Sequence, residues 1–458
     1  MLKEKLVNLL SPTQVTDEPS ELQHYGQDWI DDYKANPSLV VFPESIEQVQ
    51  KVINFCRSNK IALVPSGGRT GMSAGATATS GECVLSLERL RKIVEVSKVD
   101  RSITCQAGVV TEVAQQAAAA EGLYLPLDFG ARASSTIGGN IATNVGGLHV
   151  IRYGNIRQWV LGLKVVTASG ELLTLNGKLY KNQTGPDLTS IFIGSEGILG
   201  VIVEATLKLT RPPGDSLRML CGISNLNAAL SLLVSAREAF REITSFEFFT
   251  DRCLKQVIAH SELRQPFSEM YDFYLVIEAE TAAKDAEKWL AKNLEDGTVK
   301  NALISHSSVQ YEEFMKYREL IPELVHASHT VHKNDVSVAI SDVPAFYGDL
   351  TATFKQYYPS YEVLIFGHIG DGNLHIEVIK PEELPEQEFI NECKQVDHHI
   401  FSVVKKYHGS ISAEHGVGLL KRDYLHYTRT EAEINYLRKL KSIFDPDNIL
   451  NPGKVIPA

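Results

Sequence analysis

Hydrophobic positions early in the chain follow a strand–helix–strand pattern. An apolar run at 39–42 precedes Ser45, which forms a capping-box pattern with Gln48. Apolar residues then recur at helical spacing, namely Ile46, Val49, Ile53 and Cys56. A second apolar run follows at 61–64. Residues 39–65 therefore predict a βαβ-like unit.

Short β-rich runs alternate with turns between residues 84 and 206, which predicts strands and only one helix, at about 111–121. The clearest of these runs are 93–96, 161–166 and 201–203. A boundary signal follows at 211–215, where two prolines and a glycine come directly after a strand.

Beyond this boundary, strand-like runs alternate with helical stretches, which predicts an antiparallel sheet with helices on one face. The expected strands are 273–277, 336–340 and 363–366, and the expected helices are 226–241, 282–294, 342–357 and 386–407. We therefore predict an α+β protein whose domains are residues 1–212 and 213–415, with residues 416–458 returning to the first domain.

Composition excludes several classes of protein. A hydrophobic share of 44%, a charged share of 22% and a net charge of −11 indicate a globular protein without a nucleic-acid partner. The six cysteines form no CxxC pair, which argues against disulfides, cysteine zinc sites and iron–sulfur clusters. No window approaches the roughly 18 apolar residues of a membrane span, and we expect a cytoplasmic protein.

Three segments are rich in glycine and other small residues, which would let the backbone approach a ligand closely. They are Pro65-Ser66-Gly67-Gly68-Arg69-Thr70-Gly71, residues 135–147 and residues 194–200. Glycines permit positive φ, and successive N–H groups can form an anion site for a pyrophosphate. Neither GxGxxG nor GxxxxGK[ST] is present, so a Rossmann site or an NTPase loses its main support.

The order PSGGRTG, TIGGNIATNVGG and GSEGILGVI resembles the FAD-binding domain of vanillyl-alcohol oxidase and p-cresol methylhydroxylase relatives. The resemblance covers roughly residues 35–212 and resumes at the NPGK tail. It implies FAD, with the first segment on the pyrophosphate and the other two beside the adenosine and isoalloxazine. The first segment has Arg69 where some relatives attach FAD through a histidine, so noncovalent FAD is implied. Besides residues 65–71, the implied contacts are Thr136, Gly138, Gly139, Asn140, Ala142, Thr143, Gly146, Gly197, Ile202 and Asn451.

The strongest local signal is the run from Gly367 to His375, GHIGDGNLH. If Asp371-Gly372 form a two-residue hairpin turn, His368 lies directly opposite His375 on one face, with Cβ atoms about 5 Å apart. Glu414, after the last long predicted helix, offers a carboxylate. Two histidines and one carboxylate that leave positions open are typical of a catalytic metal site.

These motifs resemble the C-terminal half of the FAD-dependent D-2-hydroxy-acid dehydrogenases, which include D-lactate dehydrogenase, D-2-hydroxyglutarate dehydrogenase and the glycolate oxidase FAD subunit. The resemblance implies a divalent ion on His368, His375 and Glu414, zinc first and manganese or iron as alternatives. It also implies His415 as catalytic base and Arg318 and Lys333 as contacts of the substrate carboxylates. The expected reaction oxidises a small D-2-hydroxy acid to the 2-oxo acid, with hydride transfer to flavin N5.

Two departures from the hydroxyglutarate type bear on the substrate. Pro322 stands one helical turn after Arg318, where that type offers a hydroxyl, and Glu377 follows His375 by two residues on the same strand face. An anion at Glu377 would repel a second substrate carboxylate. We therefore expect D-lactate or a related monocarboxylate to be preferred over D-2-hydroxyglutarate.

Other functions stay open from the residues alone. One is a D-2-hydroxyglutarate-specific dehydrogenase; another is a flavin-bearing electron-transfer subunit with an inert metal site; a third is a metal-binding module without flavin. An electron-transfer flavoprotein, a quinone and a cytochrome are each an acceptable electron acceptor, and a homodimer is compatible with the sequence.

Overall fold

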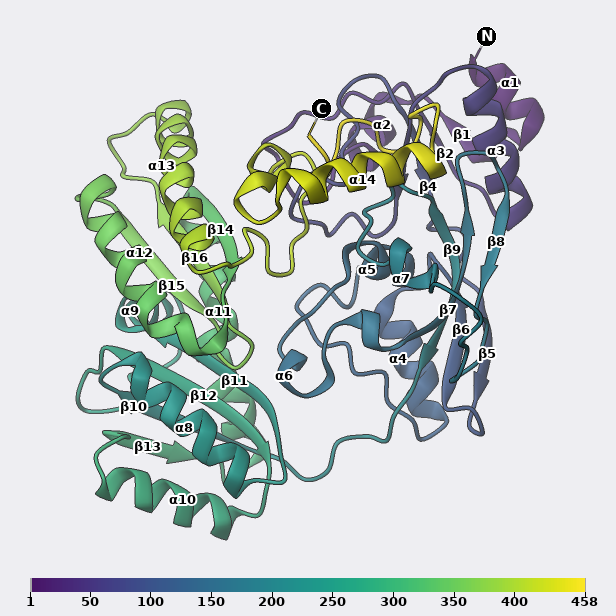
Figure 1. Cartoon of the computed structure of the whole chain (residues 1–458). Helices are drawn as coiled ribbons and strands as arrows, with labels where there is room; N and C mark the ends of the chain where they lie inside the picture. Colours follow the sequence, from purple (N-terminus) through teal and green to yellow (C-terminus); the bar gives the residue numbers. More distant parts are fainter. Residues whose placement is uncertain (1, 458) are drawn as a thin grey trace. The chain divides into compact units, whose positions relative to one another are not determined.

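The structure, a computed structural model, describes residues 2–457, which form two compact units (Figure 1). The first unit comprises the chain up to Gly147, residues 154–212 and the chain from Glu414 onward. The second unit comprises Leu148–Tyr153 and Pro213–Ala413. The chain thus leaves the first unit at the predicted proline boundary, and Glu414 and His415 open the segment that returns to it.

The first sheet of the first unit has the strand order β1-β2-β4-β3. Strands β2 and β3 each pair with β4 in parallel, whereas β1 pairs with β2 antiparallel. The predicted strand–helix–strand elements are confirmed, with β4 inserted between the two strands. The elements are β1 (Val15–Thr16), β2 (Leu39–Val41), α3 (Ile46–Ser58), β3 (Leu63–Ser66) and β4 (Cys83–Ser86).

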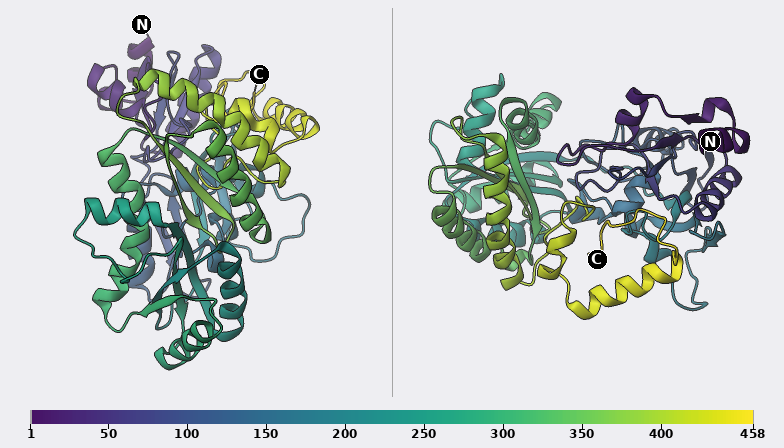
Figure 2. Two further views of the ribbon diagram at one scale, coloured as in Figure 1. Left: turned by 90° about the vertical axis from the view of Figure 1, so that its left-hand side faces the viewer. Right: turned by 90° about the horizontal axis from the view of Figure 1, so that it is seen from above.

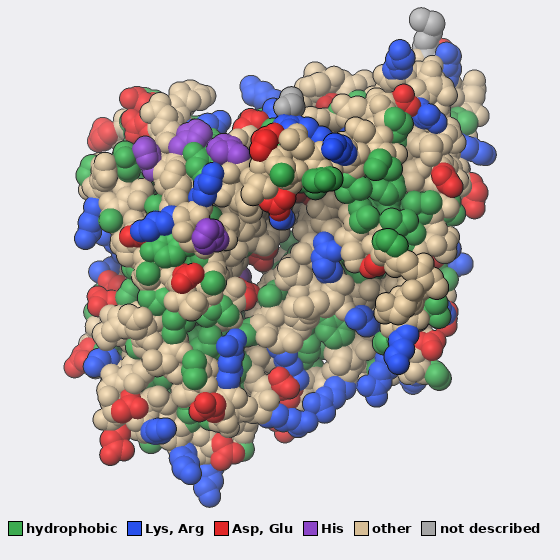
Figure 3. Space-filling view, in the orientation of Figure 1, with side chains coloured by type: hydrophobic (Ala, Val, Ile, Leu, Met, Phe, Trp, Pro, Cys, Tyr) green, Lys and Arg blue, Asp and Glu red, His purple; other side chains and the backbone are tan. Residues whose placement is uncertain are grey.

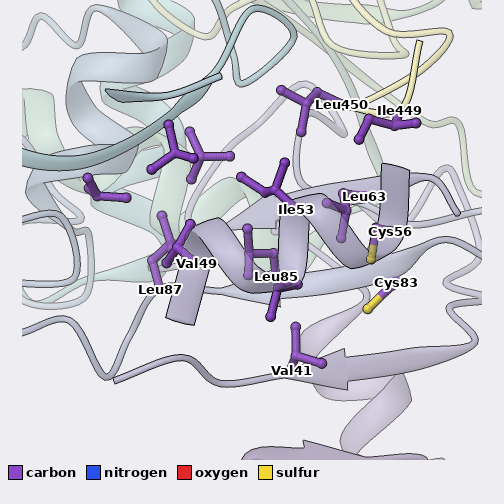
Figure 4. Close-up of a cluster of buried hydrophobic side chains, with 14 of the residues drawn as sticks. Val41, Val49, Ile53, Cys56, Leu63, Cys83, Leu85, Leu87, Ile449 and Leu450 are labelled. Atoms are coloured by element: carbon purple, nitrogen blue, oxygen red, sulfur yellow. The ribbon is translucent and has the colours of Figure 1, made fainter. Parts of the chain in front are cut away.

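Helix α3 begins at its predicted cap and buries its predicted apolar face. Ser45 Oγ accepts the Gln48 N–H at 3.2 Å, a cap that stabilises by roughly 1 kcal/mol. The Gln48 side chain accepts the Glu44 N–H at 2.7 Å instead of that of Ser45, so half of the predicted capping box forms. The buried face packs in one cluster with Leu63 and Leu450 (Figure 4).

The second sheet of the first unit is antiparallel, in the order β5-β6-β9-β7-β8. Its strands are β5 (Ile93–Ser97), β6 (Ser102–Gln106), β7 (Val160–Val166), β8 (Leu172–Leu175) and β9 (Val201–Lys208). The predicted helix is α4 (Thr111–Ala120). The helices of the first unit that sequence patterns did not predict are α1 (Leu2–Leu9), η1 (Pro12–Gln14), α2 (Pro19–Tyr25), α5 (Ile137–Thr143), η2 (Ile156–Gln158), α7 (Thr189–Phe192), η4 (Arg422–Tyr427) and α14 (Glu431–Phe444).

The C-terminal tail is part of the first unit. The Leu63 N–H donates to the Ile449 carbonyl and the Asn451 N–H to the Leu63 carbonyl, both at 2.7 Å. The side chains of Ile449 and Leu450 lie in the cluster drawn in Figure 4. The tail therefore adds to the sheet edge beside the first glycine-rich segment.

The second unit is built on one antiparallel sheet in the order β13-β10-β12-β11-β15-β16-β14. The antiparallel prediction is confirmed. The strands are β10 (Leu217–Ile223), β11 (Glu242–Thr250), β12 (Phe273–Glu280), β13 (Asn301–Ile304), β14 (Val331–Ser337), β15 (Glu362–His368) and β16 (Asn373–Ile379). The strand expected at 336–340 ends at Ser337, and a short helix, η3 (Ile340–Asp342), follows it.

Helices cover both faces of this sheet, so the prediction of helices on one face is wrong (Figures 1 and 2). Phe273 contacts Tyr347 of α12, while its neighbour Tyr274 stacks on Phe249 in the cluster formed with α9 and α11. Successive strand residues point to opposite faces, and all of β12 is buried. The helices are α6 (Val150–Tyr153), α8 (Leu226–Ala239), α9 (Asp251–His260), α10 (Ala283–Glu295), α11 (Ser308–Ser328), α12 (Val343–Tyr357) and α13 (Glu386–Lys406).

Several expectations from composition can be compared with the structure. All six cysteines are free and buried, as their spacing predicts. Within residues 2–457, no helix has the length and apolar character needed to cross a membrane. Lys and Arg side chains are interspersed with Asp and Glu over the face drawn in Figure 3.

Candidate active site

His368 and His375 lie on one face of the β15–β16 hairpin. Their ring centroids are 5.2 Å apart, with the ring planes at 82°. The register pairs His368 with Asn373 and Phe366 with His375, so the predicted two-residue turn and the direct His368–His375 pair are wrong. The register differs from the predicted one by two residues. Because an even shift keeps each side chain on its face, the predicted proximity of the histidines survives.

The longer turn follows from a contact with another strand. The Gly370 N–H donates to the Phe246 carbonyl of β11 at 3.0 Å, so it does not pair with Asn373. The N–H groups of Asp371 and Gly372 both donate to the His368 carbonyl at 3.1 Å. Gly372 has φ +87, and a Cβ there would lie 2.2 Å from the Val338 carbonyl oxygen. Glycine is therefore required at this turn.

Each histidine has a carboxylate beside its Nδ1 atom. Nδ1 of His368 is 2.8 Å from Oε1 of Glu247, and Nδ1 of His375 is 3.7 Å from Oδ1 of Asp335. Both carboxylates are 1% exposed. The contact at His368 is within hydrogen-bond distance and favours the tautomer with its proton on Nδ1 and its lone pair on Nε2, as in histidines that bind metals. The longer separation at His375 places a negative charge beside that ring.

Asp335 is itself held by its neighbours. The Asn373 side chain donates to Oδ1 of Asp335 at 2.8 Å, and the Ala413 N–H donates to Oδ2 at 3.0 Å. The segment before Ala413 pairs with β14 through two hydrogen bonds between Ser337 and Ser410, at 3.0 and 2.8 Å. Asp335 therefore fixes both the His375 strand and the last residue of the second unit.

Arg318 is oriented by Glu247. Its Nε lies 3.2 Å from Oε2 of Glu247, and its guanidinium carbon is 4.6 Å from the centroid of the Phe366 ring. The residue is 4% exposed and lies on α11, which continues through Pro322. Arg318 and His368 thus lie beside one buried carboxylate, although Nε of Arg318 and Oε2 of Glu247 make no hydrogen bond that meets normal geometry.

Glu377 is paired within the protein through one of its two carboxylate oxygens, which weakens the expected repulsion. Its Oε1 is 2.9 Å from Nε2 of His326, and Nδ1 of His326 is 3.2 Å from Nζ of Lys333. Lys333 is also the direct cross-strand partner of Glu377. The positive charge of Lys333 lies on the other side of the His326 ring and partly offsets the negative charge of Glu377.

Glu414 and His415 are the first two residues of the returning segment. Oε1 of Glu414 is 3.8 Å from Nε2 of His415, and both side chains are about one-fifth exposed. Glu414 is bonded directly to Ala413, whose N–H contacts Asp335. The next residues are held by Glu196, since Val417 and Gly418 donate their N–H groups to its carboxylate at 2.8 and 2.9 Å.

The three glycine-rich segments meet in the first unit. A Cβ on Gly67 would lie 2.4 Å from Oγ1 of Thr136, and one on Gly68 would lie 2.2 Å from the Ser134 carbonyl oxygen. Gly197, at φ +75, approaches Pro65 and Asn451, where a Cβ would lie 3.3 and 3.6 Å away. Side chains at these glycines would force the segments apart. The segments and the tail thus form one cradle of closely packed backbone.

This cradle contains polar atoms that suit a polar cofactor. Oγ of Ser66, Oγ1 of Thr136 and Oδ1 of Asn451 are buried and have no hydrogen-bond partner among the described residues. A buried polar atom without a partner costs roughly 1–3 kcal/mol, and hydroxyl, phosphate and amide groups of FAD can satisfy all three. The residues therefore fit the cofactor that the resemblance implies.

Other predicted cofactor residues have internal roles. Asn140 donates to Oγ1 of Thr111 at 2.6 Å, Thr143 donates to the Gly139 carbonyl at 3.1 Å, and Ile202 lies in the core. Arg69, at φ +59, places its guanidinium 4.5 Å from the centroid of the Tyr25 ring. The remaining predicted positions, Thr70, Gly71, Gly138, Ala142 and Gly146, lie in or beside the three segments.

Three residues of the site were missed by sequence reasoning: Glu247, Asp335 and His326. Glu247 had a readable signal, because it is a charged residue among phenylalanines in a strand-like run, and charged residues are rarely buried without a partner. Asp335 also had a readable signal, because it follows the predicted substrate residue Lys333 by two positions and so lies on the same face of a strand. His326 gave no signal of its own, since its partner lies 51 positions away.

Family models match most of the chain. The model described as "FAD binding domain" matches residues 37–176, and the one described as "FAD linked oxidases, C-terminal domain" matches residues 213–455. The fold of p-cresol methylhydroxylase with substrate bound is similar, with a TM-score of 0.75 at 14% identity, covering 99% of this chain and 96% of that one. The predicted fold class is thereby confirmed.

Two bacterial relatives are similar along nearly their whole length. The D-2-hydroxyglutarate dehydrogenase of Stutzerimonas stutzeri (strain A1501) is 45% identical over 100% of this chain and 99% of its own. That of Xanthomonas citri pv. viticola is 47% identical over 96% of this chain and 93% of its own. The chain therefore belongs to the FAD-linked oxidases, in the family that includes these D-2-hydroxyglutarate dehydrogenases.

Proposed function

We propose that this protein oxidises a D-2-hydroxy acid to the 2-oxo acid with noncovalent FAD and a divalent metal ion. The observation that carries the proposal is the pair His368 and His375 on one strand face, each with a buried carboxylate beside Nδ1. This arrangement is typical of histidines that bind a metal ion. The FAD-binding match and the glycine cradle support the cofactor.

The proposed metal ligands are His368, His375 and Glu414. The contact of Ala413 with Asp335 supports the third ligand, because Glu414 is the next residue in the chain. A bound divalent ion would supply Lewis acidity toward the hydroxyl and carboxylate of the substrate. Zinc is the proposed ion, because two histidines and one carboxylate are a donor set that suits it.

His415 is the proposed base. An imidazole accepts a proton near neutral pH, and the hydroxyl proton of the substrate must leave as the carbonyl forms. Bound FAD supplies the acceptor for the α-hydrogen and its electron pair. One proton goes to His415 and one hydride leaves the substrate carbon, so the alcohol becomes the 2-oxo acid.

D-2-hydroxyglutarate is the proposed substrate. The two bacterial relatives carry that activity in their names. Lys333 is a half-buried cation two positions from Asp335, and its partner Glu377 is already paired with His326. A distal carboxylate would therefore lie near a lysine as well as a glutamate whose charge is partly offset by its neighbours. This proposal replaces the monocarboxylate preference expected from the sequence.

The electron acceptor is proposed to be another redox carrier, an electron-transfer flavoprotein, a quinone or a cytochrome. A cytoplasmic location is proposed from the six free cysteines, because such usage is typical of reducing compartments. Absence of a histidine from residues 65–71 supports noncovalent FAD.

The test is anaerobic mixing of the purified flavoprotein with D-2-hydroxyglutarate, L-2-hydroxyglutarate, D-lactate and glycolate, followed by the absorbance of the oxidised flavin. Rapid bleaching by D-2-hydroxyglutarate and the slowest bleaching by its L-enantiomer are expected. Flavin that stays oxidised with every acid would refute the proposal and favour an electron-transfer subunit. Faster bleaching by D-lactate would refute the substrate alone.

A further inference from the structure

Glu196 joins the third glycine-rich segment to the loop that follows His415. Its two carboxylate oxygens accept the N–H groups of Val417 and Gly418 at 2.8 and 2.9 Å. The residue is 8% exposed, and Oγ of Ser73 lies 3.5 Å from Oε2. One buried side chain thus binds two consecutive backbone donors, the first of them two residues after His415.

The loop is shaped to admit this carboxylate. Gly416 has φ +85, and a Cβ there would lie 3.0–3.1 Å from the Glu196 carboxylate group. Gly418 has φ +48, and a Cβ there would lie 2.0 Å from the Ser73 carbonyl oxygen. A side chain at Gly416 would push the loop away from Glu196, and one at Gly418 would push it away from the backbone of Ser73. The two glycines therefore let the backbone after His415 close around the carboxylate.

The backbone of Glu196 is anchored to the rest of the cradle. Its N–H donates to the Ala142 carbonyl and its carbonyl accepts from the Asn451 side chain, both at 2.8 Å. Its φ of +49 is uncommon for a residue other than glycine, and these contacts hold it there. Glu196 is therefore a rigid point from which the His415 loop is held.

Burying a carboxylate costs free energy, because the charge loses its contact with water. Burial raises the pKa of Glu196, and the hydrogen bonds from Val417 and Gly418 oppose that shift. Without the two N–H groups the charge would lack its main compensation. The two hydrogen bonds to the charged carboxylate fix the position of the loop, because a charge-assisted hydrogen bond is shorter and stronger than a neutral one.

We propose that Glu196 is a positioning residue that sets the place of His415 relative to the flavin cradle. The inference rests on the base role proposed for His415. Because Glu196 belongs to the GSEG segment of the FAD-binding unit, it ties the base to the same backbone that surrounds the cofactor. Displacement of a reacting group by about 1 Å can lower a rate by about 100-fold.

The experiment is a double-mutant cycle on the holoenzyme. Glu196→Gln keeps the shape but replaces one acceptor oxygen by an NH₂ group, which faces an N–H. We expect the anaerobic rate of flavin bleaching by D-2-hydroxyglutarate to fall about 10–100-fold in the wild-type background. In the His415→Ala background the same change should lower the rate by less than about twofold, because the base that it positions is gone.

Two further variants keep the test decisive. Glu204→Gln is the matched control, since Glu204 is a carboxylate of the same unit that pairs with Lys164 at 2.9 Å; it should retain wild-type bleaching. If Glu196→Gln yields no flavin-loaded protein, Glu196→Asp takes its place, because it keeps the charge and shortens the reach by one methylene.

The possible failures are distinguishable. Equal losses from the Glu196 change in both backgrounds would mean a general structural role and overturn the inference. Wild-type bleaching by Glu196→Gln and Glu196→Asp would also overturn it. Full activity of His415→Ala alone would instead refute the base assignment in the proposed function.

Discussion

Nδ1 of His368 lies 2.8 Å from Oε1 of Glu247, a carboxylate that is 1% exposed. The same carboxylate lies 3.2 Å from Nε of Arg318. A single buried charge therefore orients the proposed metal ligand and neutralises a buried arginine. Glu247 and His368 come from β11 and β15, which are neighbouring antiparallel strands in the sheet although they are far apart in the sequence.

Removal of this carboxylate is expected to weaken metal binding. Glu247→Gln should lower metal affinity by roughly 10–100-fold, because the partner on Nδ1 fixes the tautomer and basicity of the ligand. His368→Ala should lose the ion, while FAD content stays normal in both variants because the cradle uses other segments. Metal content after dialysis, by mass spectrometry, and flavin absorbance check this.

Glu362→Gln on the same strand as His368 is the control and should retain its metal. Glu247→Gln should also lower Tm, since Arg318 loses its buried partner. A His368→Ala protein with full metal occupancy and turnover would contradict the ligand assignment.

FAD is expected to leave the protein on denaturation. The first glycine segment has Arg69 and no histidine, and the guanidinium of Arg69 packs over Tyr25. Heat or acid should therefore release yellow flavin into the supernatant, as measured by absorbance and by mass spectrometry of the soluble fraction. Flavin fluorescence that stays with the polypeptide on a denaturing gel would show a covalent bond instead.

Lys333 and Glu377 are expected to affect the dicarboxylate more than the monocarboxylate. Lys333→Met should lower kcat/KM for D-2-hydroxyglutarate by about 10–100-fold, the worth of one hydrogen bond to a charged group. D-lactate should change by less than about threefold. Glu377→Gln should raise the D-2-hydroxyglutarate value by about 2–10-fold, because a residual like charge is removed.

Steady-state kinetics with both acids measure these ratios, and Lys355→Met on α12 is the control for loss of a lysine. Equal losses for the two acids in Lys333→Met would place Lys333 away from the distal carboxylate.

Lys454 is expected to make stability depend on alkaline pH. It is 3% exposed, and its Nζ donates to the Gly75 carbonyl at 2.9 Å. Burial lowers the pKa of Lys454 to about 8 from 10.5. The unfolded chain therefore holds more protons between these values, and the unfolding free energy rises with pH across that window. Burial of the charged amine costs about 3 kcal/mol of stability below pH 8, and this cost disappears as the pH rises to 10.5.

Melting curves of wild type and Lys454→Met from pH 7 to 10.5 check this sign. The difference in Tm, wild type minus variant, should increase with pH above 8. A difference that is flat or falls over this range would mean that Lys454 is not a buried amine with a lowered pKa.

The sequence pattern identified features that depend on nearby residues. Helix α3 and its Ser45 cap follow from apolar spacing and from a hydrogen bond that spans three residues. The glycine segments and the GDGN run carry their chemistry in a few consecutive positions. His368 and His375 share a face because strand side chains repeat every two residues, and this held even though the hairpin register differed.

Other features depend on contacts between distant segments. The hairpin turn is longer than predicted because Gly370 donates to Phe246 of another strand. Arg318 is paired with Glu247, and Glu377 with His326, across 71 and 51 positions respectively. No local pattern encodes these partners, since the side chains meet only after β11, β16 and α11 pack. A buried charge requires a partner, and which residue provides it is set by the packed fold.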